Sequence, residues 1–294
     1  MTSLEGPAIR TPAGVRSNGA SRGGSIAAMP HLCANDLDIG YDVLGDGPPL
    51  VMLHAATASG RETYATLIPA LADKFRLYLP DARGHGRTRW DVADGFEAEW
   101  LVDDLAAFAD ALDLATFHVI GYSMGGMTAL GFAARSPERL RTLVPVGIAT
   151  AREPRASVAR RLMDPERILR EEPGWAADLA QAHDPVQGSG AWLRLLPAIV
   201  EDVATQPLLG PADVRRIDCP TLVVCGDRDP LVPVGQAAEL ARGVRDGRLL
   251  VAPASGHDVL TRQPGIVLEA LIGFYRSTES LAQVRDDRQS EVRP

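Results

Sequence analysis

The chain has 294 residues and 46% of them are hydrophobic, which is enough for a sizeable core in one large α/β domain or two small ones. Its formal net charge is −8 at pH 7, and an acidic surface attracts neither nucleic acid nor an anionic membrane, so we expect neither as a partner. No apolar run approaches the roughly 18 residues of a transmembrane helix, and residues 1–30 lack the apolar stretch of a signal peptide. We therefore expect a cytoplasmic protein that acts on small molecules.

The three cysteines, Cys33, Cys219 and Cys225, show neither a C-x-x-C spacing nor the Cys/His spacing of a metal site. Two of them lie in or beside apolar runs typical of strands, where a thiol is usually buried and reduced. We therefore expect free thiols and no metal site.

In chain order, residues 1–30 come first and are rich in Gly, Ser, Pro, Ala and Arg, with almost no bulky apolar side chains. Such a segment cannot bury enough surface to order itself, so we expect a disordered tail. Residues 31–150 then alternate apolar strands with amphipathic helices. Strands are expected at 31–44 (two, joined by a turn), 50–53, 75–80, 116–121 and 140–146, and helices at 60–72, 98–112 and 124–135. This alternation is typical of a mostly parallel sheet covered on both faces.

Between residues 151 and 215 the pattern changes, because prolines break the sequence into short helical pieces and no apolar strand occurs. We expect this insertion to form a small helical cap over the strand ends. The strand and helix pattern resumes over residues 216–278, with strands at 221–225 and 248–251 and a closing helix from about Pro264 to Tyr275. Residues 279–294 are highly charged and are expected to form a flexible tail.

The most informative stretch is residues 119–126, in which an apolar strand runs through Gly-x-Ser-x-Gly directly into a helix-forming segment. This context is that of a nucleophile elbow, which displays a serine on a sharp turn at a helix N-terminus. Gly121 and Gly125 have no side chains, so strand and helix can pack closely around Ser123. The alternative is a glycine-rich turn in which the serine is incidental.

Two later stretches follow the strands of the second half. Gly226-Asp227-Arg228-Asp229-Pro230 comes after one strand and Ser255-Gly256-His257-Asp258 after the next. A parallel sheet gathers such loops at one edge. A serine needs a base to become nucleophilic, and a histidine oriented by a carboxylate is such a base. The chain order Ser, Asp, His therefore indicates nucleophilic catalysis.

With these motifs the sequence resembles the α/β-hydrolase fold family over about residues 35–278. The resemblance rests on His54 after an apolar strand, the D-x-R-G-H-G-x-[ST] stretch at residues 81–88, the elbow, the G-D-x-D stretch and the Gly-His pair. It implies a mostly parallel sheet of the eight-stranded type with helices on both faces and a small helical cap. It also implies roles for five residues: Ser123 as nucleophile, Asp229 as acid, His257 as base, and the main-chain N–H groups of Met124 and Ala56 as the oxyanion hole.

Several alternatives stay open. Asp227 competes with Asp229 for the acid role, although we expect Asp227 to be a turn residue. His54 and His85 are expected to shape the loops around the nucleophile. The family has glycine where this chain has Ala55, which limits the backbone next to the Ala56 donor. Trp175 and Trp192 are expected in the interior of the cap more than against a substrate.

We therefore expect a cofactor-independent serine hydrolase that cleaves an ester or lactone of a small, fairly apolar molecule through an acyl-enzyme. The alternatives are a hydrolase of carbon–carbon bonds of the meta-cleavage type and a non-catalytic ligand-binding protein with the same fold.

Overall fold

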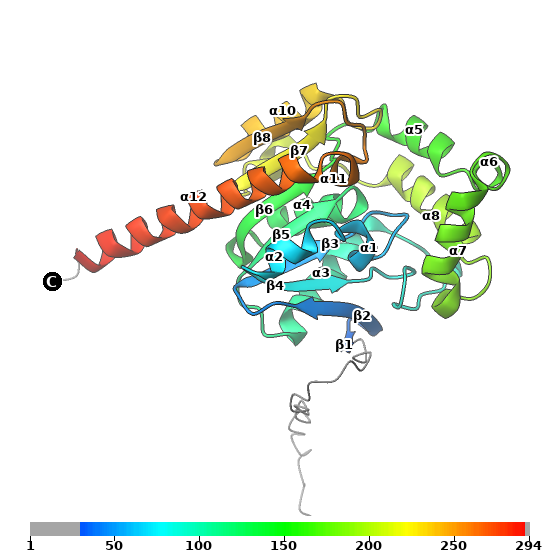
Figure 1. Ribbon diagram of the computed structural model, residues 1–294, viewed down its shortest axis with the longest axis horizontal. Helices are drawn as coiled ribbons and strands as arrows, with labels where there is room; N and C mark the ends of the chain where they lie inside the picture. The colour runs from blue at the N-terminus through cyan, green and yellow to red at the C-terminus, as the bar shows by residue number, and fades with distance from the viewer. Residues whose placement is uncertain (1–29, 292–294) are drawn as a thin grey trace, which may run out of the picture.

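The computed structural model describes residues 30–291, with side chains up to residue 278 (Figure 1). Within this range one sheet has eight strands in the order β1-β2-β4-β3-β5-β6-β7-β8. The strands are β1 (His31–Ala34), β2 (Leu37–Leu44), β3 (Pro49–Leu53), β4 (Arg76–Pro80), β5 (Phe117–Tyr122), β6 (Leu140–Val146), β7 (Thr221–Gly226) and β8 (Gly247–Ala252). Strand β2 pairs antiparallel with β1 and β4, and all other neighbours are parallel. The predicted fold class is confirmed.

Helices cover both faces of this sheet. The longer ones of the first half are α3 (Ala98–Ala111) and α4 (Met124–Arg135), and α10 (Val234–Gly243) follows β7. The other helices of the core are α1 (Gly60–Thr63), α2 (Ile68–Ala72), α11 (Val259–Arg262) and α12 (Pro264–Glu291), with short 3₁₀ turns at Val92–Asp94 and Pro137–Arg139.

Two hydrophobic clusters explain why the central strands are largely apolar. Val119 of β5 is fully buried in the cluster that includes α3, α4 and α10, whereas its neighbour Ile120 is buried in the cluster that includes α2 and α12. Successive side chains of a strand point to opposite faces, so a strand covered on both sides needs apolar residues at every position. The central strands are thereby fixed in the interior with their carboxyl ends at one edge.

The cap lies between β6 and β7 and consists of α5 (Arg155–Leu162), α6 (Pro165–Glu171), α7 (Pro173–Gln187) and α8 (Trp192–Thr205). Figure 1 shows these helices gathered at one end of the sheet. Helix α9 (Pro211–Val214) also falls in the predicted insertion of residues 151–215, but Val214 packs in the sheet cluster and α9 contacts α10. The cap helices therefore end at Thr205, because α9 buries its apolar residue against the core.

The chain ends differ in what the structure describes. The predicted N-terminal tail, apart from Pro30, lies outside the described residues. Helix α12 does not end near Tyr275 but continues to Glu291 and extends away from the body (Figure 1). Residues 279–291, predicted as a flexible tail, continue the helix because they contain neither Pro nor Gly and are rich in helix-forming residues. Cys219 and Cys225 are buried free thiols, as predicted, whereas the free thiol Cys33 is exposed.

Candidate active site

Ser123 stands between β5 and α4 with φ 53° and ψ −112°, a conformation that side chains rarely adopt. The two elbow glycines make this turn sterically feasible. A Cβ added at Gly121 would lie 2.1 Å from the carbonyl oxygen of Gly125, and one at Gly125 would lie 2.3 Å from that of Leu53. Strand and helix therefore pack backbone against backbone, and the strained turn presents the Ser123 hydroxyl at the N-terminus of α4.

Ser123, His257 and Asp229, which the sequence singles out, lie in one chain of hydrogen bonds. The Ser123 Oγ is 2.9 Å from His257 Nε2, and His257 Nδ1 is 2.7 Å from Asp229 Oδ2. A carboxylate only accepts, so Nδ1 donates to Asp229 and leaves Nε2 free to accept the serine proton. The Asp229 side chain is 1% exposed, and its Oδ1 accepts from the N–H groups of Leu231 and Val232. This arrangement can deprotonate a serine.

Asp227 lies outside this chain of hydrogen bonds. Its Oδ1 accepts from the backbone N–H of Ser255 at 3.0 Å, and its side chain is 37% exposed. The hydrogen bond from Ser255 lowers the pKa of the Asp227 carboxyl. Asp227 thus joins the β7 loop to the loop that carries His257.

Two further residues position His257, and the sequence reasoning missed both. The Tyr122 hydroxyl donates to the carbonyl oxygen of His257 at 2.6 Å, and the two rings lie 5.3 Å apart. Gly147 has φ +65°, and a Cβ there would lie 2.9 Å from His257 Cε1. The His257 ring therefore packs between the side chain of Tyr122 and the backbone of Gly147.

The two predicted oxyanion donors are also placed near the serine. Neither the N–H of Ala56 nor that of Met124 has a hydrogen-bond acceptor among the described residues, and both residues line the cavity that contains Ser123. His85 Nε2 lies 3.0 Å from the carbonyl oxygen of Ala56, and His54 Nδ1 lies 2.8 Å from that of Ala55. Burial lowers the pKa of both histidines, so both are neutral at pH 7. As predicted, they brace the loop.

The cavity above Ser123 has a volume of about 490 Å³ and lies between the sheet edge and the cap. Its floor includes Ser123, His257 and Met124. Most of its cap wall is apolar, formed by Ala159, Leu162, Met163, Trp175, Ile199 and Val203. Trp175 lines the cavity and also packs against the interior cluster of the cap, whereas Trp192 is 3% exposed and lies in the cap interior as expected. The site can enclose a small apolar molecule against the serine.

Comparison with family models fits this geometry. A model described as alpha/beta hydrolase fold matches residues 48–181, and a model described as TAP-like protein matches residues 201–280. The chain belongs to the α/β-hydrolase fold family.

Three relatives show the range of the family around this chain. A pimeloyl-[acyl-carrier protein] methyl ester esterase of Chromobacterium violaceum is 29% identical over 75% of this chain and 91% of its own length. A 2-hydroxy-6-oxononadienedioate/2-hydroxy-6-oxononatrienedioate hydrolase of Paraburkholderia xenovorans is 28% identical over 76% of this chain and 85% of its own. The structure of a thermophilic esterase from Thermogutta terrifontis has a TM-score of 0.68 and 25% identity, and the match covers 86% of this chain and 99% of that one. The chain is therefore similar to hydrolases of more than one bond type.

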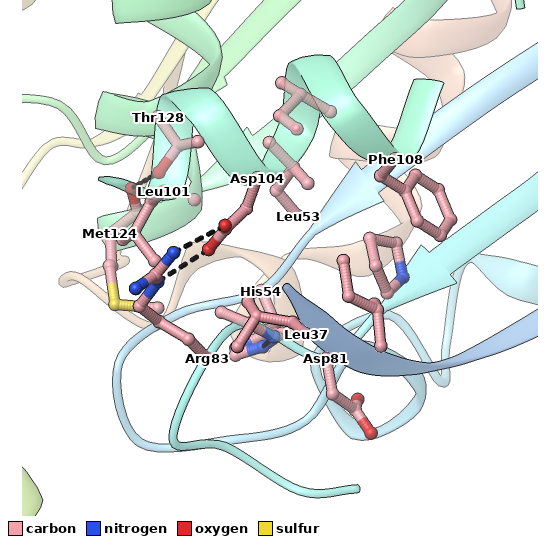
Figure 2. Close-up of a pocket in the computed structure, with 15 residues that line it drawn as sticks. Leu37, Leu53, His54, Asp81, Arg83, Leu101, Asp104, Phe108, Met124 and Thr128 are labelled. Carbon is pink, nitrogen blue, oxygen red and sulfur yellow. Dashed lines mark hydrogen bonds and ion pairs between the residues drawn. The ribbon is translucent and has the colours of Figure 1, made fainter. Parts of the chain in front are cut away.

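Arg83 of the D-x-R-G-H-G stretch makes a buried ion pair with Asp104. Figure 2 shows it joined to Asp104 by two hydrogen bonds, which measure 2.7 and 2.6 Å. The guanidinium carbon also lies 4.6 Å from the ring centre of Trp90 and 5.1 Å from that of Trp100. The space beside this pair is only about 40 Å³ and Ser123 does not line it, so it is distinct from the cavity above Ser123.

The same stretch anchors the cap. His183 of α7 accepts a hydrogen bond from the Gly86 N–H at 3.2 Å, and Gln187 donates to the carbonyl oxygen of Thr88 at 2.7 Å. Sequence reasoning did not find His183 or Gln187, because each is about a hundred residues from its partner and neither lies in a motif. Helix α7 is thus attached to the core by polar contacts.

No group of three or more His, Cys, Asp or Glu side chains is arranged as metal ligands in the part of the chain that the structure describes. Over the same residues, no helix is both long and apolar enough to cross a membrane.

Proposed function

We propose that the protein is a serine hydrolase that cleaves an ester or lactone bond of a small, fairly apolar molecule without a cofactor. The observation that carries this proposal is the Ser123–His257–Asp229 chain of hydrogen bonds at the floor of a largely apolar cavity. The esterases among its relatives support it. A lactone is a cyclic ester, so the same groups act on both.

The reaction would begin with attack of the Ser123 Oγ on the carbonyl carbon while His257 Nε2 takes the hydroxyl proton. The negative charge that develops on the carbonyl oxygen would be stabilised by the N–H groups of Met124 and Ala56. His257 would then return the proton to the leaving alcohol as the carbon–oxygen bond breaks. Water, deprotonated by His257, would release the acid from the acyl-enzyme, and Asp229 would stabilise the imidazolium in both steps.

The first test is covalent labelling by a fluorophosphonate, with the Ser123→Ala variant as control. We expect the wild type to be labelled and the variant not. We also expect Ser123→Ala to lower kcat by at least about 10³-fold, because the covalent step has no substitute nucleophile. Its melting temperature should match that of the wild type, because one hydroxyl contributes little packing. Full activity in a folded Ser123→Ala protein would exclude this mechanism.

A second candidate is hydrolysis of a carbon–carbon bond of the meta-cleavage type, which the Paraburkholderia relative favours. A panel of p-nitrophenyl esters of increasing chain length, lactones and meta-cleavage-type diketones separates the two. Turnover of the esters or lactones supports the first proposal, and turnover of the diketones alone supports the second. A folded wild type that neither reacts with the fluorophosphonate nor turns over any compound would favour a ligand-binding role.

A further inference from the structure

Arg155 is a buried cation in the wall of the substrate cavity. It is the first residue of α5 and is 7% exposed. It lines the same cavity as Ser123. Among the described residues that line this cavity, Arg155 is the one Lys or Arg. Its neighbours in that wall include Ala159 and Leu162, which are apolar. Arginine is seldom buried without a partner, because removing its charge from water is costly.

The guanidinium of Arg155 lacks such a partner in the protein. Its Nε is buried with no hydrogen-bond acceptor among the described residues, and its Nη2 has only a long contact of 3.5 Å to the carbonyl oxygen of Val203. No described carboxylate lies within ion-pair distance of it. Arg83 differs, because Asp104 accepts two of its hydrogen bonds. Arg155 therefore has donor capacity that the protein does not use.

Asp202 interacts electrostatically with Arg155, but the Asp202 oxygens already accept hydrogen bonds from other groups. Oδ1 accepts from the N–H of Ala98 at 2.9 Å, and Oδ2 accepts from the side chain of Gln206 at 3.0 Å. Burial raises the pKa of the Asp202 carboxyl and lowers that of the Arg155 guanidinium, as expected in a wall of low polarity. Asp202 offsets part of the charge of Arg155 without hydrogen-bonding to it.

The other acidic residues of the cavity wall are at its solvent side. Glu62 and Asp258 are both exposed, and Asp258 forms an ion pair of 2.8 Å with Arg262. None of the ion pairs among the described residues joins Glu62 or Asp258 to Arg155. An acidic group brought in by a ligand would therefore meet an unoccupied guanidinium in the interior of the cavity.

We propose that Arg155 binds a carboxylate of the substrate, so that the preferred substrates are esters or lactones that carry a free acid group away from the bond that is cleaved. The substrate preference rests on the proposed function, whereas the binding of a carboxylate by Arg155 does not. A guanidinium binds a carboxylate through two parallel, charge-assisted hydrogen bonds, which are strongest where water is excluded. The apolar wall would contact the chain between the acid group and the reacting carbonyl.

The kinetic test compares monomethyl esters of linear dicarboxylic acids from four to eight carbons with the matching dimethyl esters. We expect the wild type to prefer the monoesters, with an optimum at one chain length that bridges Ser123 and Arg155. In Arg155→Met the ratio of kcat/KM for the best monoester to that for its diester should fall at least about 30-fold, mainly through KM. Arg155→Lys keeps the charge but loses the planar guanidinium, so its ratio should lie between those of the wild type and Arg155→Met.

The matched control is Arg160→Met, which removes an exposed arginine from the same helix α5. We expect the Arg160→Met ratio to equal that of the wild type, which excludes an effect of net charge alone. The stability of Arg155→Met is a second control. Replacing an unpaired buried charge by an apolar side chain is often neutral or stabilising, so its melting temperature should not fall below that of the wild type. A purely structural arginine would predict a clear loss.

Calorimetry separates this inference from the proposed function. In the Ser123→Ala protein the best monoester should bind, its diester should bind at least about 10-fold more weakly, and Arg155→Met in that background should remove the difference. If the wild type hydrolyses no ester but this binding pattern is seen, the proposed function fails and the carboxylate site stands. If the wild type hydrolyses diesters as well as monoesters and Arg155→Met leaves the ratio unchanged, the carboxylate site is wrong and the proposed function stands.

Discussion

Asp227 and Asp229 are two residues apart, yet their hydrogen bonds differ in kind. Asp229 is buried and binds the His257 ring, whereas Asp227 binds the backbone N–H of Ser255. Side chains at i and i+2 of a tight turn point in different directions, so only one of the pair reaches the histidine. Pro230 favours an extended backbone at Asp229, which directs that side chain toward His257.

We therefore expect Asp229→Asn to lower kcat by about 10³–10⁴-fold with little change in KM. The amide can donate a hydrogen bond to Nδ1, which favours the wrong tautomer of His257, and it has no negative charge to stabilise the imidazolium. Asp227→Asn is the matched control and should change kcat less than about tenfold, because its amide oxygen can still accept from Ser255. Both variants are measured on one ester. The reverse order of the two rates would transfer the acid role to Asp227.

Gly147 has no side chain, which leaves space for the ring of His257. Gly147→Ala should lower kcat by about 10²-fold, because a methyl group 2.9 Å from Cε1 displaces the base. Gly188→Ala is the control: Gly188 also has positive φ, 96°, but a Cβ there has nothing within 4 Å. Both variants place a side chain at positive φ, so equal losses of kcat would show that backbone strain and not displacement of the ring is responsible.

At the scale of single residues, the candidate site residues that lie in motifs could be predicted from the sequence. Ser123, Asp229 and His257 could be predicted because each follows a strand in a characteristic local context. Tyr122, Gly147 and Arg155 could not, since their importance depends on contacts with residues distant in the sequence. A buried arginine in a cap helix has no local signal that separates it from the exposed arginines beside it.

At the scale of elements, helix α7 is joined to the core through a neutral histidine. Burial lowers the pKa of His183 from its ordinary 6.5 to about 4, and its Nε2 is buried without a partner among the described residues. A histidine whose folded pKa is lowered contributes stability that is present above about pH 6.5 and is lost as the pH falls toward 4. Mild acid should therefore loosen α7 from the Gly86 loop.

The test compares urea unfolding of the wild type and His183→Asn from pH 5 to pH 8. Asparagine keeps an acceptor for the Gly86 N–H but does not titrate. Between pH 7 and pH 5 the wild type should lose about 2 kcal/mol more unfolding free energy than the variant, which follows from a pKa of about 4 in the folded state. Parallel curves for the two proteins would show that His183 does not titrate as its burial implies.

The elements themselves were largely predictable, because apolar strands and amphipathic helices alternate clearly. The misplaced boundaries have physical causes. Helix α9 falls within the predicted insertion of residues 151–215 because no apolar strand occurs in that range, but Val214 packs against apolar residues of the sheet cluster. Helix α12 continues past its predicted end at Tyr275 because charge alone does not stop a helix, and residues 276–291 contain neither Pro nor Gly.

At the scale of the whole molecule, the cap has a small hydrophobic interior of its own. Ile168 is fully buried with Leu179, Trp192 and Leu196, all of which belong to α6, α7 or α8. A separate cluster connects the cap to the core, with Leu195 and Ile199 of α8 against Ala56, Phe96 and Leu101. Because the cap has an interior of its own, we expect it to open as a unit while the sheet, Ser123 and His257 stay folded.

Native-state hydrogen exchange tests whether the cap opens independently of the sheet. Ile168→Ala removes buried methyl groups and should cost the cap about 2–5 kcal/mol, because the surrounding helices cannot fully close the cavity. Amide exchange in α6 to α8 should then accelerate, whereas the central strands β5 and β6 should keep their wild-type protection as long as the protein stays folded. Leu169→Ala is the matched control, since Leu169 is the next residue and is 53% exposed, and it should leave both regions unchanged. If Ile168→Ala accelerated exchange equally in β5 and β6, the cap and the sheet would unfold as one cooperative unit, and substrate entry by opening of the cap alone would be excluded.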